Sequence, residues 1–330
     1  MAIDRQILPT LLISFFAAML AAAPGVAQEW PTRSITIVVP YAAGGPNDTV
    51  ARVVSARLAE ILRAQIVIEN VGGAGGMTGS NRVAKAAPDG YTLLLASSAG
   101  LAQIPNLYKR PLYNAVTDFE AVTLLTDSAR ILITRRDFPA KTLAEFIAYT
   151  KVNAAKLQYS SAGAGSGGHT CAILLDTVMG THFAHVPYRG AGPALTDLMA
   201  GRIDYSCEQV TTAFPQIEAG VIKAIATLGP TRPNVLKDLP TAEEQGVGGL
   251  DCNAWIAFVA PKGTPAAIVR RLAVASSEAL DAPSVRERFE SVGVTVVPPA
   301  RRGPEFLARF IPEEIAKWAG PIMASGVSIE

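Results

Sequence analysis

The chain has 330 residues, of which 49% are hydrophobic and 17% are charged, and its formal net charge is +1. A chain of this length can form one large or two medium-sized domains with ample core. The near-neutral charge provides no basic surface of the kind that binds nucleic acid or an anionic membrane, so we expect neither partner.

The first 27 residues predict a secretory signal peptide. An apolar stretch over residues 7–23 follows MAIDRQ and ends in small residues. Gly25 and Ala27 occupy positions −3 and −1 before Gln28, which is the pattern of a cleavage site. The stretch is short for a membrane span, so an anchor is disfavoured. We expect cleavage near Ala27 and a mature protein that is soluble, exported and monomeric.

From residue 35 onward, strand-like and helix-like patterns alternate. ITIVV, at residues 35–39, is a continuous β-branched run, as expected of a strand buried on both faces. After the loop PYAAGGPND, Asp48 is predicted to cap a helix with one apolar stripe. Further strands are predicted over 66–70 and 91–96, and the first of these ends in another Gly-rich loop.

The second half of the chain continues the alternation. Strands are predicted over residues 157–162, 182–188, 203–207, 222–227 and 254–260, and helices over 142–151, 169–180, 264–280 and 301–324. Strands that alternate with helices predict an α/β fold with mostly parallel sheet.

Three Gly-rich turns each follow a predicted strand and open a helix, at Gly44-Gly45, at 72–79 and at 163–168. Such turns direct backbone N–H groups at the start of a helix, where an anion is stabilised. Each loop alone is equally well explained as a tight turn that needs a positive φ. Together they favour a site that holds a small anion by backbone amides.

The third turn, SSAGAGSGGH at residues 160–169, allows two other interpretations. Its G-x-G-x-x-G resembles a dinucleotide fingerprint, but Arg189 stands where the acidic partner should be. Ser166 resembles the nucleophile of a hydrolase elbow, but no histidine follows at the expected distance and no group is evident to orient His169. We therefore expect neither a nucleotide cofactor nor a catalytic serine.

The cysteines and histidines do not predict a metal site. Cys171, Cys207 and Cys252 are an odd number, which leaves at least one free thiol and allows one disulfide. His182 and His185 are three residues apart in a predicted strand, so they point to opposite faces. We expect no metal and leave the pairing of the cysteines open.

Several motifs, in this order and spacing, resemble the periplasmic substrate-binding receptors of tripartite tricarboxylate transporters, the Bug-type receptors. They are PYAAGGPNDTVAR (40–52), IENVGGAGG (68–76), APDGYTLL (87–94), GAGSGGH (163–169), VPYRGAGPALTDLMAGRID (186–204), LPTAEEQG (239–246) and WIAFVAPKGTP (255–265). The similarity runs from about Trp30 to the end of the chain.

The resemblance implies a two-lobed clamshell, each lobe a mostly parallel sheet flanked by helices. Lobe one would comprise residues 28–127 and 254–330, and lobe two residues 128–253. Such a receptor is not an enzyme. It captures a small carboxylate, held chiefly by backbone amides and ordered waters, and delivers it to a membrane permease. The sequence leaves the identity of the carboxylate open.

On the positions that match, the resemblance implies ligand-binding residues in both lobes. They are Tyr41, Gly44, Gly45, Asp48 and Ser97 in lobe one, and Gly165, Ser166, His169, Tyr188, Arg189 and Glu208 in lobe two. Glu208 stands where the family often has Asp, so its role is open. Two alternatives remain: an exported α/β hydrolytic enzyme, and a ligand-sensing receptor that signals without transport.

Overall fold

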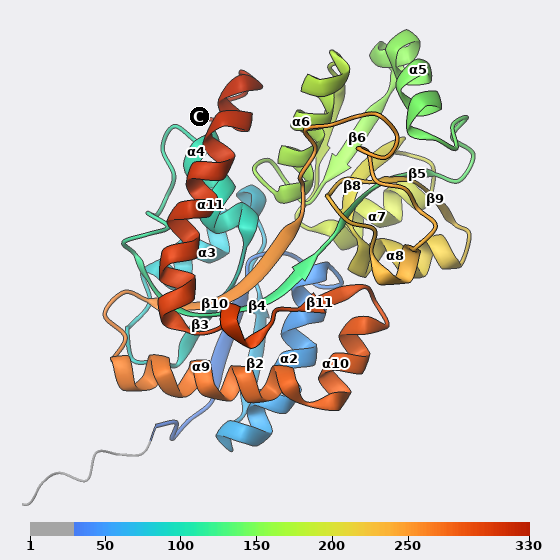
Figure 1. Ribbon diagram of the computed structural model, residues 1–330. Coiled ribbons are helices and arrows are strands. Elements are labelled where there is room, and N and C mark those ends of the chain that lie inside the picture. The colour runs from blue at the N-terminus through green and yellow to red at the C-terminus, as the bar shows by residue number, and fades with distance from the viewer. Residues whose placement is uncertain (1–29) are drawn as a thin grey trace, which may run out of the picture. The chain divides into compact units, whose positions relative to one another are not determined.

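Two β-sheets, between which the chain crosses in both directions, form the framework of residues 33–330 (Figure 1). The structure is a computed structural model and describes residues 30–330. The predicted signal peptide and its cleavage site lie outside this range. In the part of the chain that is described, no helix is long and apolar enough to span a bilayer.

The first sheet has the strand order β11-β4-β10-β3-β1-β2. Its strands are β1 (Ile35–Val39), β2 (Ile66–Asn70), β3 (Thr92–Ser97), β4 (Phe119–Ser128), β10 (Ala254–Pro261) and β11 (Val294–Val296). β1 pairs in parallel with β2 and β3. β10 is antiparallel to β3 and β4, and β11 is antiparallel to β4. We call this sheet and its helices the first lobe.

The second sheet has the order β7-β6-β8-β5-β9. Its strands are β5 (Arg130–Arg135), β6 (Gln158–Ser161), β7 (Ala184–Pro187), β8 (Tyr205–Gln209) and β9 (Ile222–Thr227). β6 is parallel to β7 and β8, whereas β5 is antiparallel to β8 and β9. This sheet and its helices form the second lobe.

Both sheets are therefore mixed, and the expectation of mostly parallel pairing is wrong. The reason lies in how the chain crosses between the sheets. β4 runs toward the second sheet and continues as β5 after the single residue Ala129 (Figure 1). β10 brings the chain back, so it must run against β4. The lobe boundaries at 127/128 and 253/254 stay predictions.

Helices flank both sheets. In the first lobe these are α2 (Pro46–Leu62), α3 (Met77–Ala84), α4 (Ile104–Leu107), α9 (Ala266–Asp281), α10 (Pro283–Glu290) and α11 (Pro304–Ala324). In the second lobe they are α5 (Leu143–Asn153), α6 (Gly167–Met179), α7 (Ala191–Met199) and α8 (Val210–Glu218). Short helical turns cover Ala74–Gly76, Ala99–Gln103, Ala154–Lys156, Asn234–Leu236 and Pro299–Arg301.

Helix α2 begins two residues earlier than its predicted cap. Its N-cap is Gly45, and Pro46 occupies the first helical position, where a missing N–H costs nothing. Asp48 is the third helical residue, so the prediction that it caps the helix is wrong. Of the predicted apolar stripe, Val50, Val54, Leu58 and Leu62 are buried, whereas Val53 and Ile61 are half-buried.

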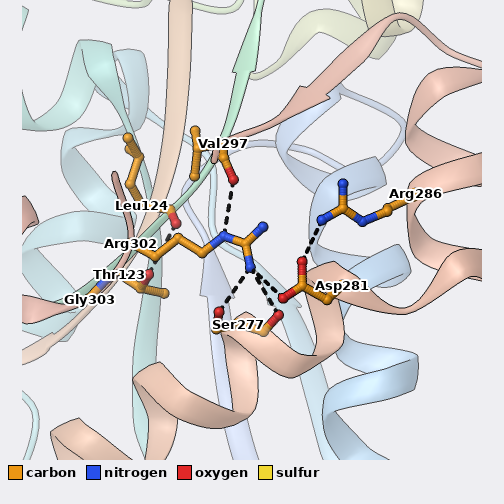
Figure 2. A network of polar contacts seen from close by, with 8 residues as sticks. All are labelled: Thr123, Leu124, Ser277, Asp281, Arg286, Val297, Arg302 and Gly303. Carbon is orange, nitrogen blue, oxygen red and sulfur yellow. Dashed lines mark hydrogen bonds and ion pairs between the residues drawn. The ribbon is translucent and has the colours of Figure 1, made fainter. Parts of the chain in front are cut away.

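A buried arginine fastens the C-terminal part of the first lobe (Figure 2). Arg302 donates from Nε to the Val297 carbonyl oxygen at 3.0 Å and from Nη1 to the Ser277 hydroxyl at 2.9 Å. Nη1 also contacts the Asp281 carboxylate at 2.9 Å, and that carboxylate pairs with Arg286 as well. The network ties α9 and α10 to the segment that leads into α11.

Candidate functional site

In the described chain, strand-to-helix junctions from both lobes surround a cavity between them. The space free of atoms within it, counted together with the solvent at its opening, is about 490 Å³. It is lined by Tyr41, Gly45, Pro46, Asn47, Ser97, Ser98, Ala99, Arg130, Ser161, Ala162, Ser166, Gly167, Gly168, Ala191, Cys207, Glu208 and Gln209. The junctions follow β1, β3, β6 and β8, so the cavity lies beyond the carboxyl ends of these strands, where α/β sheets bind ligands.

The starts of two helices open onto this cavity, α2 after Gly45 and α6 after Ser166. Neither N-cap residue makes a side-chain cap, and the buried Ser166 hydroxyl has no partner among the described residues. The first N–H groups of a helix have no partner within the helix and carry partial positive charge. Two of the three predicted Gly-rich turns therefore present donors to the cavity.

Arg130, the first residue of β5, places a cation in the cavity although it is only 5% exposed. Its Nη1 donates to the Cys207 carbonyl oxygen at 3.0 Å and its Nε to that of Cys252 at 3.3 Å. Nη2 has no hydrogen-bond partner among the described residues and lies against Gly167, where an added Cβ would be 2.5 Å away. Burial lowers the pKa of Arg130, but a guanidinium stays charged.

Sequence reasoning missed Arg130. The only signal was a charged residue at the head of the apolar run RILIT, which is unusual because arginine is rarely buried without partners.

Glu208, near the end of β8, is the acidic group of the cavity and is 7% exposed. Its Oε1 accepts a hydrogen bond from the Gln209 N–H at 2.7 Å. Burial raises the pKa of Glu208, whereas the Arg130 charge, this hydrogen bond and one from the Thr212 side chain act against the rise. The two opposite charges interact without forming a direct ion pair.

The second predicted Gly-rich turn packs against the other lobe, and its glycines do not line the cavity. Gly75, with φ +62°, touches the loop after β6 so closely that an added Cβ would lie 2.2 Å from the Ala164 carbonyl oxygen. The Tyr108 hydroxyl donates to the same oxygen at 3.0 Å. On the other side, Ala42 N donates to the Arg189 carbonyl oxygen at 3.0 Å. These contacts hold the lobes together around the cavity.

Of the eleven residues singled out from the sequence, the structure places Tyr41, Gly45, Ser97, Ser166 and Glu208 on the cavity. The Tyr41 hydroxyl donates to the Gly75 carbonyl oxygen at 2.9 Å and lies 3.1 Å from the Ser97 hydroxyl. Tyr41 therefore links the first Gly-rich loop to the second.

Gly44 and Asp48 shape the first loop from behind. The Gly44 N–H donates to the Asp48 carboxylate at 3.0 Å, and Gly44 has φ +82°. Arg52 and Asn70 also donate to this carboxylate. Burial raises the pKa of Asp48, but the hydrogen bonds from Arg52, Gly44 and Asn70 outweigh it and bring the pKa below its usual value.

His169 and Gly165 also lie behind the cavity. The Gly165 N–H donates to Nδ1 of His169 at 3.2 Å, and the His169 ring stacks on His185 with centroids 4.2 Å apart. His185 in turn lies 2.7 Å from the hydroxyl of Ser161, which does line the cavity. Burial lowers the pKa of both histidines, to about 4 for His169 and about 3 for His185, where the His169 charge contributes.

Tyr188 and Arg189 do not line the cavity. The Tyr188 hydroxyl donates to the Asp197 carboxylate at 2.6 Å. Arg189 has an exposed side chain and contacts the first lobe through its carbonyl oxygen.

A disulfide joins Cys171 in α6 to Cys252, just before β10, and Cys207 is free and buried. The sequence had left this pairing open. Because the Cys252 carbonyl oxygen also accepts from Arg130, the bridge connects helix α6 to the group that holds the cation in place. No group of three or more His, Cys, Asp or Glu side chains suited to a metal ion occurs within residues 30–330.

A family model described as "Tripartite tricarboxylate transporter family receptor" matches residues 50–327. The chain belongs to this family. Among curated relatives it is 41% identical over 317 residues to the Agrobacterium vitis "UPF0065 protein in the TAR-I ttuE-ttuC' intergenic region", covering 94% of this chain and 91% of the relative.

Solved structures of the family share the fold. The periplasmic binding protein BugD has a TM-score of 0.89 and 36% identity, over 91% of this chain and all of BugD. Rhodopseudomonas palustris MatC with bound malate has a TM-score of 0.87 and 40% identity, over 89% of this chain and all of MatC. R. palustris Rpa4515 with adipate has a TM-score of 0.86 and 31% identity, over 92% and 100%. The predicted two-lobed α/β clamshell is thereby confirmed.

Proposed function

We propose that this protein is a periplasmic solute-binding receptor that captures a small carboxylate between its lobes and delivers it to the permease of a tripartite tricarboxylate transporter. The observation that carries the proposal is the meeting of Arg130 with the start of α6 in one buried cavity. A carboxylate there would accept a charge-assisted hydrogen bond from Nη2 of Arg130 and others from the helix N–H groups.

Two further observations support this function. The cavity lies between lobes whose loops interlock, as expected where a clamshell closes over its ligand. The relatives solved with malate and with adipate each carry a dicarboxylate. Export and cleavage near Ala27 belong to the same proposal.

The hydrolase alternative has less support. The Ser166 hydroxyl has no partner among the described residues, and Nδ1 of His169 is occupied by the Gly165 N–H. Ser161 and His185 are within hydrogen-bond distance, but in the described chain no carboxylate contacts His185 to orient it. We therefore propose a receptor that does not turn over its ligand.

Thermal unfolding of the mature protein with a panel of mono-, di- and tricarboxylates tests the binding function. A ligand at 100 times its Kd adds about 2.7 kcal/mol to the free energy of unfolding. Native mass spectrometry of freshly purified protein would identify a ligand that co-purifies. The proposal fails if the protein unfolds cooperatively but no carboxylate stabilises it.

Delivery to a permease is tested in cells by uptake of the identified ligand. Deletion of the receptor and deletion of the permease should each abolish uptake. A response to the ligand that persists without the permease would favour the signalling alternative. N-terminal sequencing should show that the exported protein begins near Gln28.

A further inference from the structure

The cavity carries two opposite charges that do not neutralise each other by direct contact. Two nitrogens of Arg130 donate hydrogen bonds to the carbonyl oxygens of Cys207 and Cys252. The Glu208 carboxylate accepts hydrogen bonds from the Gln209 N–H and from the Thr212 side chain. Both side chains are more than nine-tenths buried and both line the cavity. Their remaining hydrogen-bonding positions are therefore available to a ligand in the same cavity.

Several hydrogen-bond donors line this space. Nη2 of Arg130 lies against Gly167, at the start of α6. The Ser166 hydroxyl and the Asn47 side-chain amide are buried there without partners among the described residues, and Asn47 lies at the start of α2. These donors suit a carboxylate, which only accepts hydrogen bonds.

Acceptors gather where β8 meets α8. The Glu208 carboxylate lines the cavity, and next to it the buried side-chain oxygen of Gln209 has no partner among the described residues. An ionised carboxylate and an amide oxygen offer no proton to a ligand. A second ligand carboxylate placed here would meet like charge and leave these acceptors unpaired, which is costly in a buried site.

Building on the proposed function, we propose that Glu208 makes this receptor selective for a carboxylate that also carries a hydrogen-bond donor, that is, a hydroxy- or amino-carboxylate. The ligand carboxylate lies toward Arg130 and the start of α6, and its hydroxyl or amino group donates to Glu208. An acid of the same carbon skeleton without that donor leaves Glu208 without a hydrogen bond from the ligand and binds more weakly.

Matched acids test the proposal directly. Calorimetric titration compares malate and aspartate with succinate, 2-hydroxyglutarate and glutamate with glutarate, and lactate with propionate. In the pair whose skeleton fits, we expect the hydroxy or amino acid to bind roughly ten-fold or more tightly than the plain acid, as for a charge-assisted hydrogen bond. Glu208→Gln should bring this ratio close to one.

Glu218→Gln is the matched control, because Glu218 is exposed at the far end of α8. It should leave every affinity unchanged. If Glu208→Gln did not fold, Glu208→Asp, which keeps the charge but draws it back, should lower the same ratio.

The outcomes separate this inference from the function on which it rests. If the wild type binds succinate, glutarate or propionate as tightly as its donor-bearing partners, the selectivity is wrong while the receptor function stands. An equal loss of affinity for both members of a pair in Glu208→Gln would make Glu208 merely structural. If no carboxylate binds the folded wild type, the proposed function itself fails.

Discussion

Gly75 lies against Ala164 across the two lobes, so closely that a Cβ atom on Gly75 would be 2.2 Å from the Ala164 carbonyl oxygen. Gly75→Ala should therefore keep the loops apart and lower ligand affinity by about ten-fold or more. Gly180→Ala is the matched control, because Gly180 has a similar φ, +66° against +62°, but an added Cβ there meets no atom within 4 Å.

Both alanine variants should lose about 1 kcal/mol of stability from the positive φ. Only Gly75→Ala should lose affinity, as measured by the ligand-induced rise in melting temperature. An equal ligand response in the two variants would show that the loop contact does not support binding.

Arg130→Met should lower affinity for any carboxylate by roughly ten- to a hundred-fold, because it removes the buried guanidinium while keeping side-chain volume. It should also destabilise the protein, since the Cys207 and Cys252 carbonyl oxygens lose their donor. Arg189→Met removes an arginine outside the cavity and should bind normally in the same calorimetric titration. Wild-type affinity in Arg130→Met would remove the central support for the proposed function.

Loss of the Cys171–Cys252 bridge should destabilise the protein by about 2–4 kcal/mol, because the bridge closes a long loop with a sequence separation of 81. Chemical denaturation of a Cys171→Ala, Cys252→Ala double variant measures this. Addition of a reductant should lower the stability of the wild type but not of the double variant.

Burial raises the pKa of the free Cys207 thiol to about 12, so it should react with an alkylating agent only on unfolding.

The stacked histidines predict acid sensitivity. Their folded pKa values, about 4 for His169 and about 3 for His185, lie below the ordinary value of 6.5. Below about pH 6.5 the unfolded chain binds protons that the folded protein does not. Each histidine therefore contributes stability above that pH, which is lost toward pH 4 with a slope of at most about 1.4 kcal/mol per pH unit. His185→Gln should flatten this loss in urea denaturation series, whereas His182→Gln, at an exposed position, should not.

The buried carboxyl group of Asp176, in the same region, makes stability depend on pH in the opposite direction. Burial raises its pKa to about 7, and its Oδ1 atom has no partner among the described residues. The contribution of the protonated acid is present below about pH 4 and is lost as the pH rises through 7. Asp176→Asn should therefore match the wild type near pH 4 and have a melting temperature a few degrees higher at pH 8. A difference in melting temperature between variant and wild type that stays constant from pH 4 to pH 8 would contradict the raised pKa of Asp176.

Local patterns predicted much of the fold. The β-branched run of β1 and the apolar stripe of α2 are visible in the sequence because burial of one strand or one helix face leaves a local periodic record. Strands β4, β5 and β11 were not predicted. β4 and β5 together read as one long segment, and only pairing with distant strands divides it at Ala129.

The site was predicted less completely, because its chemistry depends on contacts between distant segments. Ser166 and Glu208 were found through family motifs. Arg130 was not, since its partners lie 77 and 122 residues away in the chain. The cysteine pairing also could not be chosen from spacing, because three cysteines allow several pairings and only their positions in space select one.

Arg130 is two residues after Ser128, where the chain leaves the first sheet. A rotation of one lobe about this link would displace atoms in proportion to their distance from it, so Arg130 would move less than residues far from the link. The hinge between the lobes would thus carry the positive charge of the cavity. A solute that enters between open lobes would meet the Arg130 guanidinium already in its binding position, and closure would add the contacts from the opposite lobe.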